Sequence, residues 1–172
     1  SGNGRHVIQA TVGLRPLYKT GSGLHWLLTD GTDDLLQVTW SALAQPYEVV
    51  AALRAETTGD GVFVAGGDTN AGPIYDGGTD LRIYAGAELI GLTVPAEDVD
   101  FVVTARFNGA SSRIAVDNGS YNTGDAGTNS TVGFTIGANA DGSLIKAVRL
   151  YGAVVMPRIL TDGEIANLRT YF

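Results

Sequence analysis

Apolar residues recur at every second position along almost the whole chain, and this period restricts the fold more than any other feature. In residues 101–108, for example, apolar side chains on alternate positions predict a strand with one buried face. Residues 47–55 are apolar at nearly every position, which is typical of a strand covered on both faces. About ten to twelve such runs, with turn residues every ~8–12 positions, predict an all-β sandwich of two antiparallel sheets.

Glycine makes up 24 of the 172 residues, about twice its usual share of ~7%. Only 5 prolines occur, and short apolar runs separate the glycines, so the excess indicates tight turns rather than disorder. A length near 150 residues is usual for one domain, and neither a repeat nor a break in composition divides this chain. We therefore expect residues 1–172 to form a single domain.

The charge balance excludes several classes of partner. The formal net charge is −7, and the only lysines are Lys19 and Lys146, so a basic face for nucleic acid is not expected. No apolar run approaches the ~18–20 residues that a membrane span needs. Because the chain has no cysteine, it can form no disulfide, thiolate metal site or cysteine nucleophile.

Two local patterns predict specific connections. The Asp30-Gly31 step between the apolar runs 24–28 and 35–40 predicts a hairpin. Near the end, Thr161 and Glu164 have the spacing of a capping box and predict the start of a short C-terminal helix. The apolar stripe of this helix is formed by Ile165, Leu168 and Phe172. The aromatic residues expected in the core are Trp26, Phe101, Phe107 and Phe134.

Several segments resemble one known family. Residues 24–36 resemble the Trp-Leu-x-Phe-Asp-Gly-x-Asp-Asp segment of concanavalin A-like, laminin-G-type jelly rolls. Residues 133–137 and 147–155 are similar to the apolar-Ile-Gly strand and the long Val-Arg-Leu/Ile-Tyr strand that close such domains. Residues 158–165 are similar to the short capped helix that follows. The lead-in segment Arg15–Lys19 resembles those of bacteriophage tail and virion proteins of this class.

This resemblance implies a concanavalin A-like jelly-roll β-sandwich with a short C-terminal helix. The roles that it implies are carbohydrate binding, adhesion, and service as an accessory domain of polysaccharide-active enzymes or phage appendages. Because one fold serves many functions, the site residues have to be argued separately.

The sequence offers no catalytic pair. A retaining glycosidase needs two carboxyl groups ~5–5.5 Å apart, and no glutamate here has a second acid two or four positions away within a predicted strand. Glu97, Asp98 and Asp100 come nearest, but they follow Pro95 and precede a predicted strand. The two histidines, His6 and His25, lack the companion residues of polysaccharide lyases of this fold. We therefore expect that the chain is not an enzyme.

Sugar binding needs aromatic faces against the rings and planar polar groups for the hydroxyls. Two long segments, 66–79 and 119–131, are rich in Gly, Asn, Asp and Thr and are predicted to be irregular loops. The candidates are Asp68, Asn70, Tyr75 and Asp76 on the first loop, Tyr121, Asn122 and Asp125 on the second, and Trp40 at the end of an earlier strand. The alternative is that these polar residues serve only the turns that they favour.

Arg82 and Tyr84 alternate with apolar residues and are expected to point away from the core. The pairs that share this pattern on other strands are Arg106 with Asn108 and Arg113 with Asp117. If the strands are adjacent, these residues form one polar face like the concave carbohydrate surface of the family. The alternative is cross-strand charge pairing on a solvated sheet face.

Asp30, Asp33 and Asp34 place three carboxylates within five residues, and such hard oxygen ligands suit Ca²⁺. The spacing lacks the twelve-residue EF-hand pattern, and the same residues are also ordinary turn chemistry. No cofactor is required by this sequence, and calcium is the one ion that it suggests.

Two functional hypotheses follow. The first is a carbohydrate- or receptor-binding, lectin-like module of a phage tail, fibre or virion surface, with a surface polysaccharide or glycan as its partner. The second is a non-catalytic structural or decoration module that packs against other virion or appendage proteins, or against copies of itself as a homo-oligomer such as a trimer. Both predict a virion-surface or extracellular location.

Overall fold

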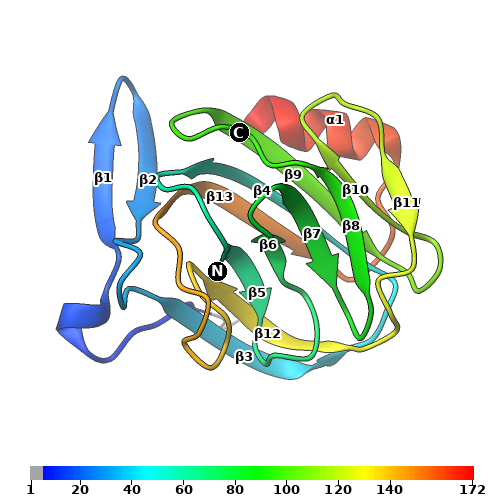
Figure 1. The fold of residues 1–172 in the computed structure, drawn as a ribbon, viewed down its shortest axis with the longest axis horizontal. Coiled ribbons are helices and arrows are strands. Elements are labelled where there is room, and N and C mark those ends of the chain that lie inside the picture. The colour runs from blue at the N-terminus through cyan, green and yellow to red at the C-terminus, as the bar shows by residue number, and fades with distance from the viewer. Residues whose placement is uncertain (1–5) are drawn as a thin grey trace.

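The computed structural model describes residues 6–172, so residues 1–5 of the expected domain lie outside the described part. Within it, thirteen strands form two antiparallel sheets that pack face to face (Figure 1). The strands are β1 (Leu17–Gly21), β2 (Leu24–Leu28), β3 (Leu36–Leu43), β4 (Tyr47–Ala55), β5 (Gly61–Gly66), β6 (Ile74–Asp76), β7 (Asp80–Tyr84), β8 (Glu88–Thr93), β9 (Asp100–Phe107), β10 (Ser112–Val116), β11 (Asn122–Gly124), β12 (Thr131–Ile136) and β13 (Val148–Met156). A 3₁₀ turn, η1, spans Val12–Leu14, and helix α1 spans Asp162–Tyr171.

The strand order defines a seven-stranded and a six-stranded sheet. The first has the order β1-β2-β13-β4-β9-β10-β11, and the second has the order β3-β12-β5-β6-β7-β8. The predicted fold class, an all-β sandwich of two antiparallel sheets with one short C-terminal helix, is confirmed.

The core fills the space between the sheets. Phe63 of β5 meets Phe101 of β9 edge-on, with ring centroids 5.6 Å apart. The predicted strand 47–55 is β4, and it is covered on both faces as expected: Val49 faces the core between the sheets, while Val50 lies under α1. Phe107 and Phe134 are also buried in the core, as predicted.

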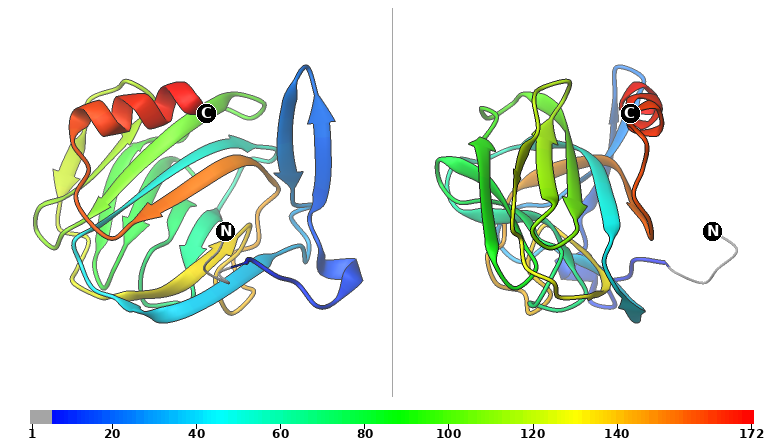
Figure 2. Two further views of the ribbon diagram at one scale, coloured as in Figure 1. Left: turned by 180° about the vertical axis from the view of Figure 1, so that it is seen from behind. Right: turned by 90° about the vertical axis from the view of Figure 1, so that its right-hand side faces the viewer.

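Helix α1 covers part of the outer face of the seven-stranded sheet (Figure 2). Thr161 is its N-cap and forms the predicted capping box with Glu164. Ile165 is buried against Val50, and Leu168 and Phe172 pack around them. The predicted helix and its apolar stripe are therefore confirmed.

The Asp30-Gly31 step does not form the predicted hairpin. The strand before it, β2, belongs to the seven-stranded sheet, and the strand after it, β3, belongs to the six-stranded sheet. The hairpin instead joins β1 to β2 through Ser22 and Gly23. An Asp-Gly step suits any tight change of direction, so the dipeptide did not distinguish a hairpin from a crossover between sheets.

Residues 17–28, here called the β1–β2 arm, stand apart from the sandwich (Figures 1 and 2). The arm is hydrogen-bonded to β13 only through the pairs Leu27–Leu150 and Leu28–Arg149. Trp26 was predicted in the core but lies on the opposite face of β2 from the core residue Leu27. It packs there between the Arg149 guanidinium, 5.0 Å from the ring, and Tyr151.

Three strands were not expected. β1 precedes the first predicted run, and β6 and β11 lie within the two segments predicted as loops. Both of these strands are three residues long, which is too short for a period of two to be recognised between glycines. The segments 66–79 and 119–131 are therefore only partly irregular.

A buried ion pair crosses the interior at one end of the sandwich. Lys146 is 2% exposed and Asp76 is 3% exposed, and Nζ of Lys146 lies 2.9 Å from Oδ2 of Asp76. Nζ also donates to the backbone carbonyls of Thr57 and Gly59, at 3.0 and 2.7 Å. All three donors of the ammonium group are thereby used, which offsets the cost of burying the charge.

Replacing this lysine is expected to destabilise the fold. In Lys146→Met the Asp76 carboxylate stays buried without its cation, and such a change lowers the free energy of unfolding by about 3–5 kcal/mol. Urea denaturation measures this loss. The control is Lys19→Met, which changes the other lysine on the exposed strand β1 and is expected to cost less than about 0.5 kcal/mol. Equal losses for the two variants would contradict the assignment.

The capping box gives the fold a pH-dependent contribution. Hydrogen bonds from Arg158 and from Thr161 lower the pKa of Glu164 to about 2 from its ordinary 4.5. A depressed carboxyl pKa stabilises the fold above pH 4.5, and this stabilisation is lost as the pH falls toward about 2. Wild type is therefore expected to be more stable than Glu164→Gln at neutral pH, with the difference shrinking in acid. Thermal unfolding at several pH values measures it, and a difference that is constant down to pH 2 would refute the assignment.

Candidate functional site

The outer face of the six-stranded sheet carries a row of side chains that crosses four strands. The pairing places Tyr75 of β6 between Val62 of β5 and Arg82 of β7. Arg82 in turn pairs with Ile90 of β8. Tyr84, two positions after Arg82, is the diagonal neighbour of Tyr75 on the same face. As the alternation predicts, Arg82 and Tyr84 point away from the core.

A pocket of about 180 Å³ opens beside this row. Here called the tyrosine pocket, it is lined by Val62, Thr69, Pro73, Tyr75, Tyr84, Asn139 and Leu144. The connection after β12 reaches over β5, where the Val62 N–H donates to the Leu144 carbonyl at 2.8 Å. This contact brings Asn139 and the exposed Leu144 to the side chains of Tyr75 and Tyr84.

Glu88 connects the tyrosine pocket to Arg82. One of its carboxylate oxygens accepts a hydrogen bond from the Tyr75 hydroxyl, and the other lies 3.3 Å from Nη1 of Arg82. Burial and the hydrogen bond to Glu88 raise the pKa of Tyr75, so the hydroxyl stays protonated at neutral pH. The ring of Tyr75 is therefore held in place through its oxygen.

The chemistry of the tyrosine pocket suits a sugar. Two half-buried tyrosine rings and the exposed Leu144 side chain offer apolar surface to the C–H face of a pyranose or furanose. Asn139 supplies an amide and Thr69 a hydroxyl for hydrogen bonds to sugar hydroxyls. A concave, mostly apolar surface with a few polar groups is the usual form of a small-ligand site.

The first predicted loop cluster is partly at this site. Tyr75 lines the tyrosine pocket, and Asn70 follows its lining residue Thr69. The Asn129 side chain donates to the Asn70 carbonyl at 2.9 Å, so the segments around 70 and 129 meet. Asp76 does not lie on an exposed loop as predicted, because it alternates with Tyr75 on β6 and is buried against Lys146.

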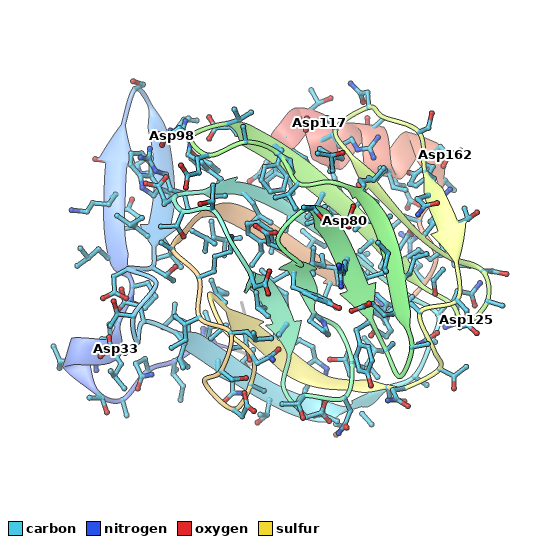
Figure 3. All side chains as sticks on the ribbon, in the orientation of Figure 1. Asp33, Asp80, Asp98, Asp117, Asp125 and Asp162 are labelled. Atoms are coloured by element: carbon cyan, nitrogen blue, oxygen red, sulfur yellow. The ribbon has the colours of Figure 1, made fainter. Side chains whose placement is uncertain are left out.

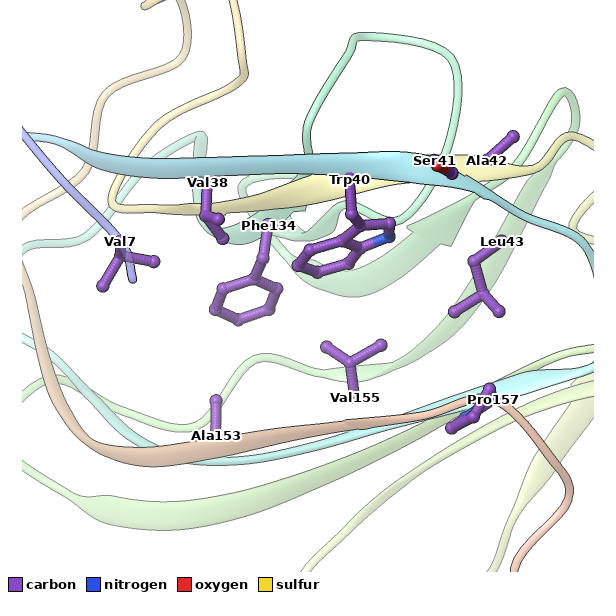
Figure 4. Close-up of a pocket in the computed structure, with 10 residues that line it drawn as sticks. All are labelled: Val7, Val38, Trp40, Ser41, Ala42, Leu43, Phe134, Ala153, Val155 and Pro157. Carbon is purple, nitrogen blue, oxygen red and sulfur yellow. The ribbon is translucent and has the colours of Figure 1, made fainter. Parts of the chain in front are cut away.

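Trp40 lies away from the tyrosine pocket. It is in the middle of β3, not at its end, and it points into an apolar slot of about 700 Å³ between the sheets. Figure 4 shows Trp40 and Phe134 on one wall and Ala153 and Val155 on the other. The slot runs where β3 and the second half of β13 lie at the edges of their sheets.

The second predicted loop cluster is at the opposite edge of the sandwich. Asn122 of β11 donates to the Ile90 carbonyl of β8 at 2.7 Å and so connects the two sheets. The Tyr121 ring lies under the Arg113 guanidinium, 3.8 Å from its centroid. Asp125 accepts the Gly127 N–H within its own turn. The structure does not bring these residues together with Tyr75.

The expected single polar face does not form. Arg106 and Arg113 lie on the seven-stranded sheet, whereas Arg82 lies on the six-stranded one. Both of the former arginines approach the buried Glu48, at 3.0 and 3.7 Å, beneath the start of α1. Arg106 also donates to the Leu160 carbonyl, and Arg113 pairs with Asp162, so both arginines hold the C-terminal segment in place. The predicted alternative of cross-strand charge pairing is therefore right about the pairing, but the face is covered by α1 instead of being solvated.

The acidic residues considered for catalysis are engaged elsewhere. Asp100 accepts hydrogen bonds from Arg54 at 2.7 Å and from the Tyr151 hydroxyl at 2.6 Å. Glu97 accepts the Thr58 N–H. His25 lies on the β1–β2 arm, where its Nδ1 is 2.6 Å from the Tyr18 hydroxyl. Asp100, Glu97 and His25 are all absent from the lining of the tyrosine pocket.

Asp30, Asp33 and Asp34 do come together, with one ligand atom from each within 4.8 Å of the others. Oδ1 of Asp30 accepts three backbone N–H groups of its own turn, and the first of these, from Thr32, contributes most to lowering the pKa of Asp30. Burial and the Asp30 charge raise the pKa of Asp34. The oxygens suit Ca²⁺ in type but supply three of the six to eight ligands it takes, so calcium here stays a prediction.

The site residues that sequence reasoning missed are Val62, Thr69, Pro73, Glu88, Asn139 and Leu144. Glu88 follows Tyr84 by four positions across a tight turn, and this spacing could have identified it. Asn139 and Leu144 are far away in the chain, and the pairing of β5 with β12 together with the Val62–Leu144 backbone hydrogen bond brings them near.

Comparisons with known proteins show the fold. No family model matches the chain, and no curated protein matches it. Among solved structures, the binding domain of Paraclostridial Mosquitocidal Protein 1 is similar with a TM-score of 0.74 and 11% identity, covering 99% of this chain and 48% of that one. Domain 4 of AbnA, an extracellular arabinanase from Geobacillus stearothermophilus solved in complex with arabinotriose, has a TM-score of 0.62 and 17% identity, covering 90% and 81%.

Trypanosoma rangeli sialidase, solved in complex with the inhibitor DANA, is also similar, with a TM-score of 0.61 and 16% identity. The match covers 88% of this chain and 28% of the sialidase chain. This chain therefore spans less than half the length of the sialidase and of the mosquitocidal protein domain. In residues 6–172, no helix has the length and apolar character to cross a membrane.

Proposed function

We propose that this chain is a non-catalytic glycan-binding module that holds its sugar in the tyrosine pocket. The observation that carries the proposal is the pair of tyrosines, Tyr75 and Tyr84, set on rigid strands beside an amide and a hydroxyl in one pocket. Tyr75 is held through Glu88, so its ring needs little further ordering when a sugar packs on it.

The structural neighbours support the sugar as ligand class. A domain similar over 90% of this chain was solved with arabinotriose. A second similar structure is a toxin binding domain. The resemblance of the closing strands to laminin-G-type jelly rolls, and of Arg15–Lys19 to phage lead-in segments, supports a place on a phage tail, fibre or virion surface. A surface polysaccharide of the host cell is then the expected partner, and the location is the virion surface or extracellular space.

A glycan and bacterial-polysaccharide array, run with Ca²⁺ and again with chelator, tests the function. We expect saturable binding that Tyr75→Ala and Tyr84→Ala each weaken at least about tenfold, equivalent to ~1.4 kcal/mol. Tyr171→Ala, at the exposed end of α1, is the control and is expected to bind like wild type.

Loss of binding in Tyr121→Ala alone would move the site to the β11 edge, and silence across the array would overturn the proposal. If chelator abolishes binding but Asp34→Asn does not, the required calcium lies outside the cluster of Asp30, Asp33 and Asp34.

The β1–β2 arm favours a second candidate function, a structural module that packs against other copies or other proteins. Leu17, Tyr18 and Leu24 on this arm are 55%, 66% and 46% exposed, and β1 is an unpaired sheet edge. Exposed apolar edge strands are sites of association with another chain. The same arm serves either a homo-oligomer, such as a trimer, or another appendage protein.

Sedimentation equilibrium tests this second function. A self-associating arm predicts an oligomer, such as a trimer, that Leu17→Asp and Leu24→Asp convert to monomers. The control is Ile90→Asp, which changes an exposed apolar residue on the other sheet and is expected to leave the oligomer intact. A wild-type monomer at high concentration would contradict self-association.

A further inference from the structure

We infer that the tyrosine pocket selects uncharged glycans and discriminates against sialylated, uronic-acid or sulfated ones. This inference rests on the proposed function and specifies its ligand class. An anionic sugar that leaves water needs a cation or a set of free N–H donors in the site, so the charges around the pocket decide which glycans it accepts.

Arg82 is the one Lys or Arg side chain on the six strands of this sheet, all of which lie in the described part of the chain. Its guanidinium faces two carboxylates: Glu88 at 3.3 Å and Asp80 at 3.8 Å. Figure 3 labels Asp80 on this sheet. The single positive charge is therefore matched by two negative ones.

One side of the Arg82 side chain also packs against the backbone. A Cβ atom added to Gly77 would collide with the guanidinium, so the arginine lies tightly against the turn before β7. Its Nε is buried and has no hydrogen-bond partner. An anionic sugar that approached this guanidinium would also approach the carboxylates of Glu88 and Asp80, and Glu88 positions Tyr75 as well. An anion that competed with Glu88 for the arginine would thus loosen the ring on which the sugar packs.

The remaining charges near the pocket have the same sign or are already paired. Asp68 precedes the lining residue Thr69, and Asp141 lies between the lining residues Asn139 and Leu144. The nearest lysine, Lys146, directs its ammonium inward to Asp76. An anionic ligand would therefore meet net negative charge, and a neutral one would not.

Matched glycan pairs test this inference. The probes are lactose and sialyllactose, and methyl-esterified and free oligogalacturonate, on one array and then in titration calorimetry. We expect the neutral member of a bound pair to bind at least about tenfold more tightly. Its affinity is expected to stay constant between low and high salt, since no ion pair forms with the ligand.

Glu88→Gln tests whether the pairing of Arg82 causes the preference for neutral glycans. Glutamine keeps an acceptor for the Tyr75 hydroxyl but removes one of the two charges on Arg82, so the preference for the neutral glycan is expected to shrink several-fold. The matched control is Asp98→Asn, the same charge change on an exposed residue in the connection between β8 and β9 (Figure 3), which is expected to leave the preference unchanged.

The possible results distinguish failure of the charge selection from failure of the glycan-binding function. Equal or tighter binding of the anionic glycan, still lost in Tyr75→Ala, overturns the charge selection and leaves the glycan-binding function intact. A preference that Glu88→Gln does not reduce also overturns the inference, because its cause is then not the pairing of Arg82. Absence of binding to every glycan refutes the proposed function and the inference with it.

Discussion

The ion pair between Lys146 and Asp76 is the interaction on which the outer face of the six-stranded sheet depends. Side chains on a strand alternate, so directing Asp76 inward to Lys146 directs Tyr75 outward to the pocket. The same ammonium group binds the carbonyls of the connection between β4 and β5. Its stem passes where Gly61 has no side chain, and a Cβ there would lie 2.8 Å from Cβ of Lys146. One buried cation thereby sets the register of the strand that presents the first tyrosine.

The two outer faces of the sandwich differ in how they are covered. The face of the seven-stranded sheet is occupied by α1 and by ion pairs such as Arg54–Asp100 and Arg149–Glu56. The face of the six-stranded sheet holds two tyrosines and a single arginine already paired with Glu88. Aromatic surface and a compensated charge therefore occur together on this face, and both suit an uncharged sugar.

Sequence patterns predicted much of this molecule for identifiable reasons. Long strands such as β4 and β9 were visible because each contains several periods of the alternation, and α1 because its capping box is a local signal. Tyr75 and Tyr84 were found because tyrosine is conspicuous between glycines or on a polar strand face. Asp76 was placed wrongly, because a three-residue strand holds too little alternation to reveal its inward side.

The rest of the site could not be predicted from local patterns. Asn139 and Leu144 reach the pocket because β12 pairs with β5 and because the next connection bonds to Val62, contacts between segments about seventy to eighty residues apart. The hairpin predicted at Asp30-Gly31 was wrong for a related reason, because the sheet to which a strand belongs depends on the whole topology. Trp26 reached the outer face because its partners, Arg149 and Tyr151, lie on a distant strand.

The slender attachment of the β1–β2 arm has a consequence for how the molecule opens. Two residue pairs join the arm to β13, whereas β4 pairs with both of its neighbours along most of its length. Trp26 and Leu27 pack on the sandwich near the base of the hairpin, so its tip, around Ser22 and Gly23, opens at a smaller free energy than global unfolding. The tip of the arm can therefore reorder when another chain pairs with β1, while the tyrosine pocket, on the other sheet, keeps its shape.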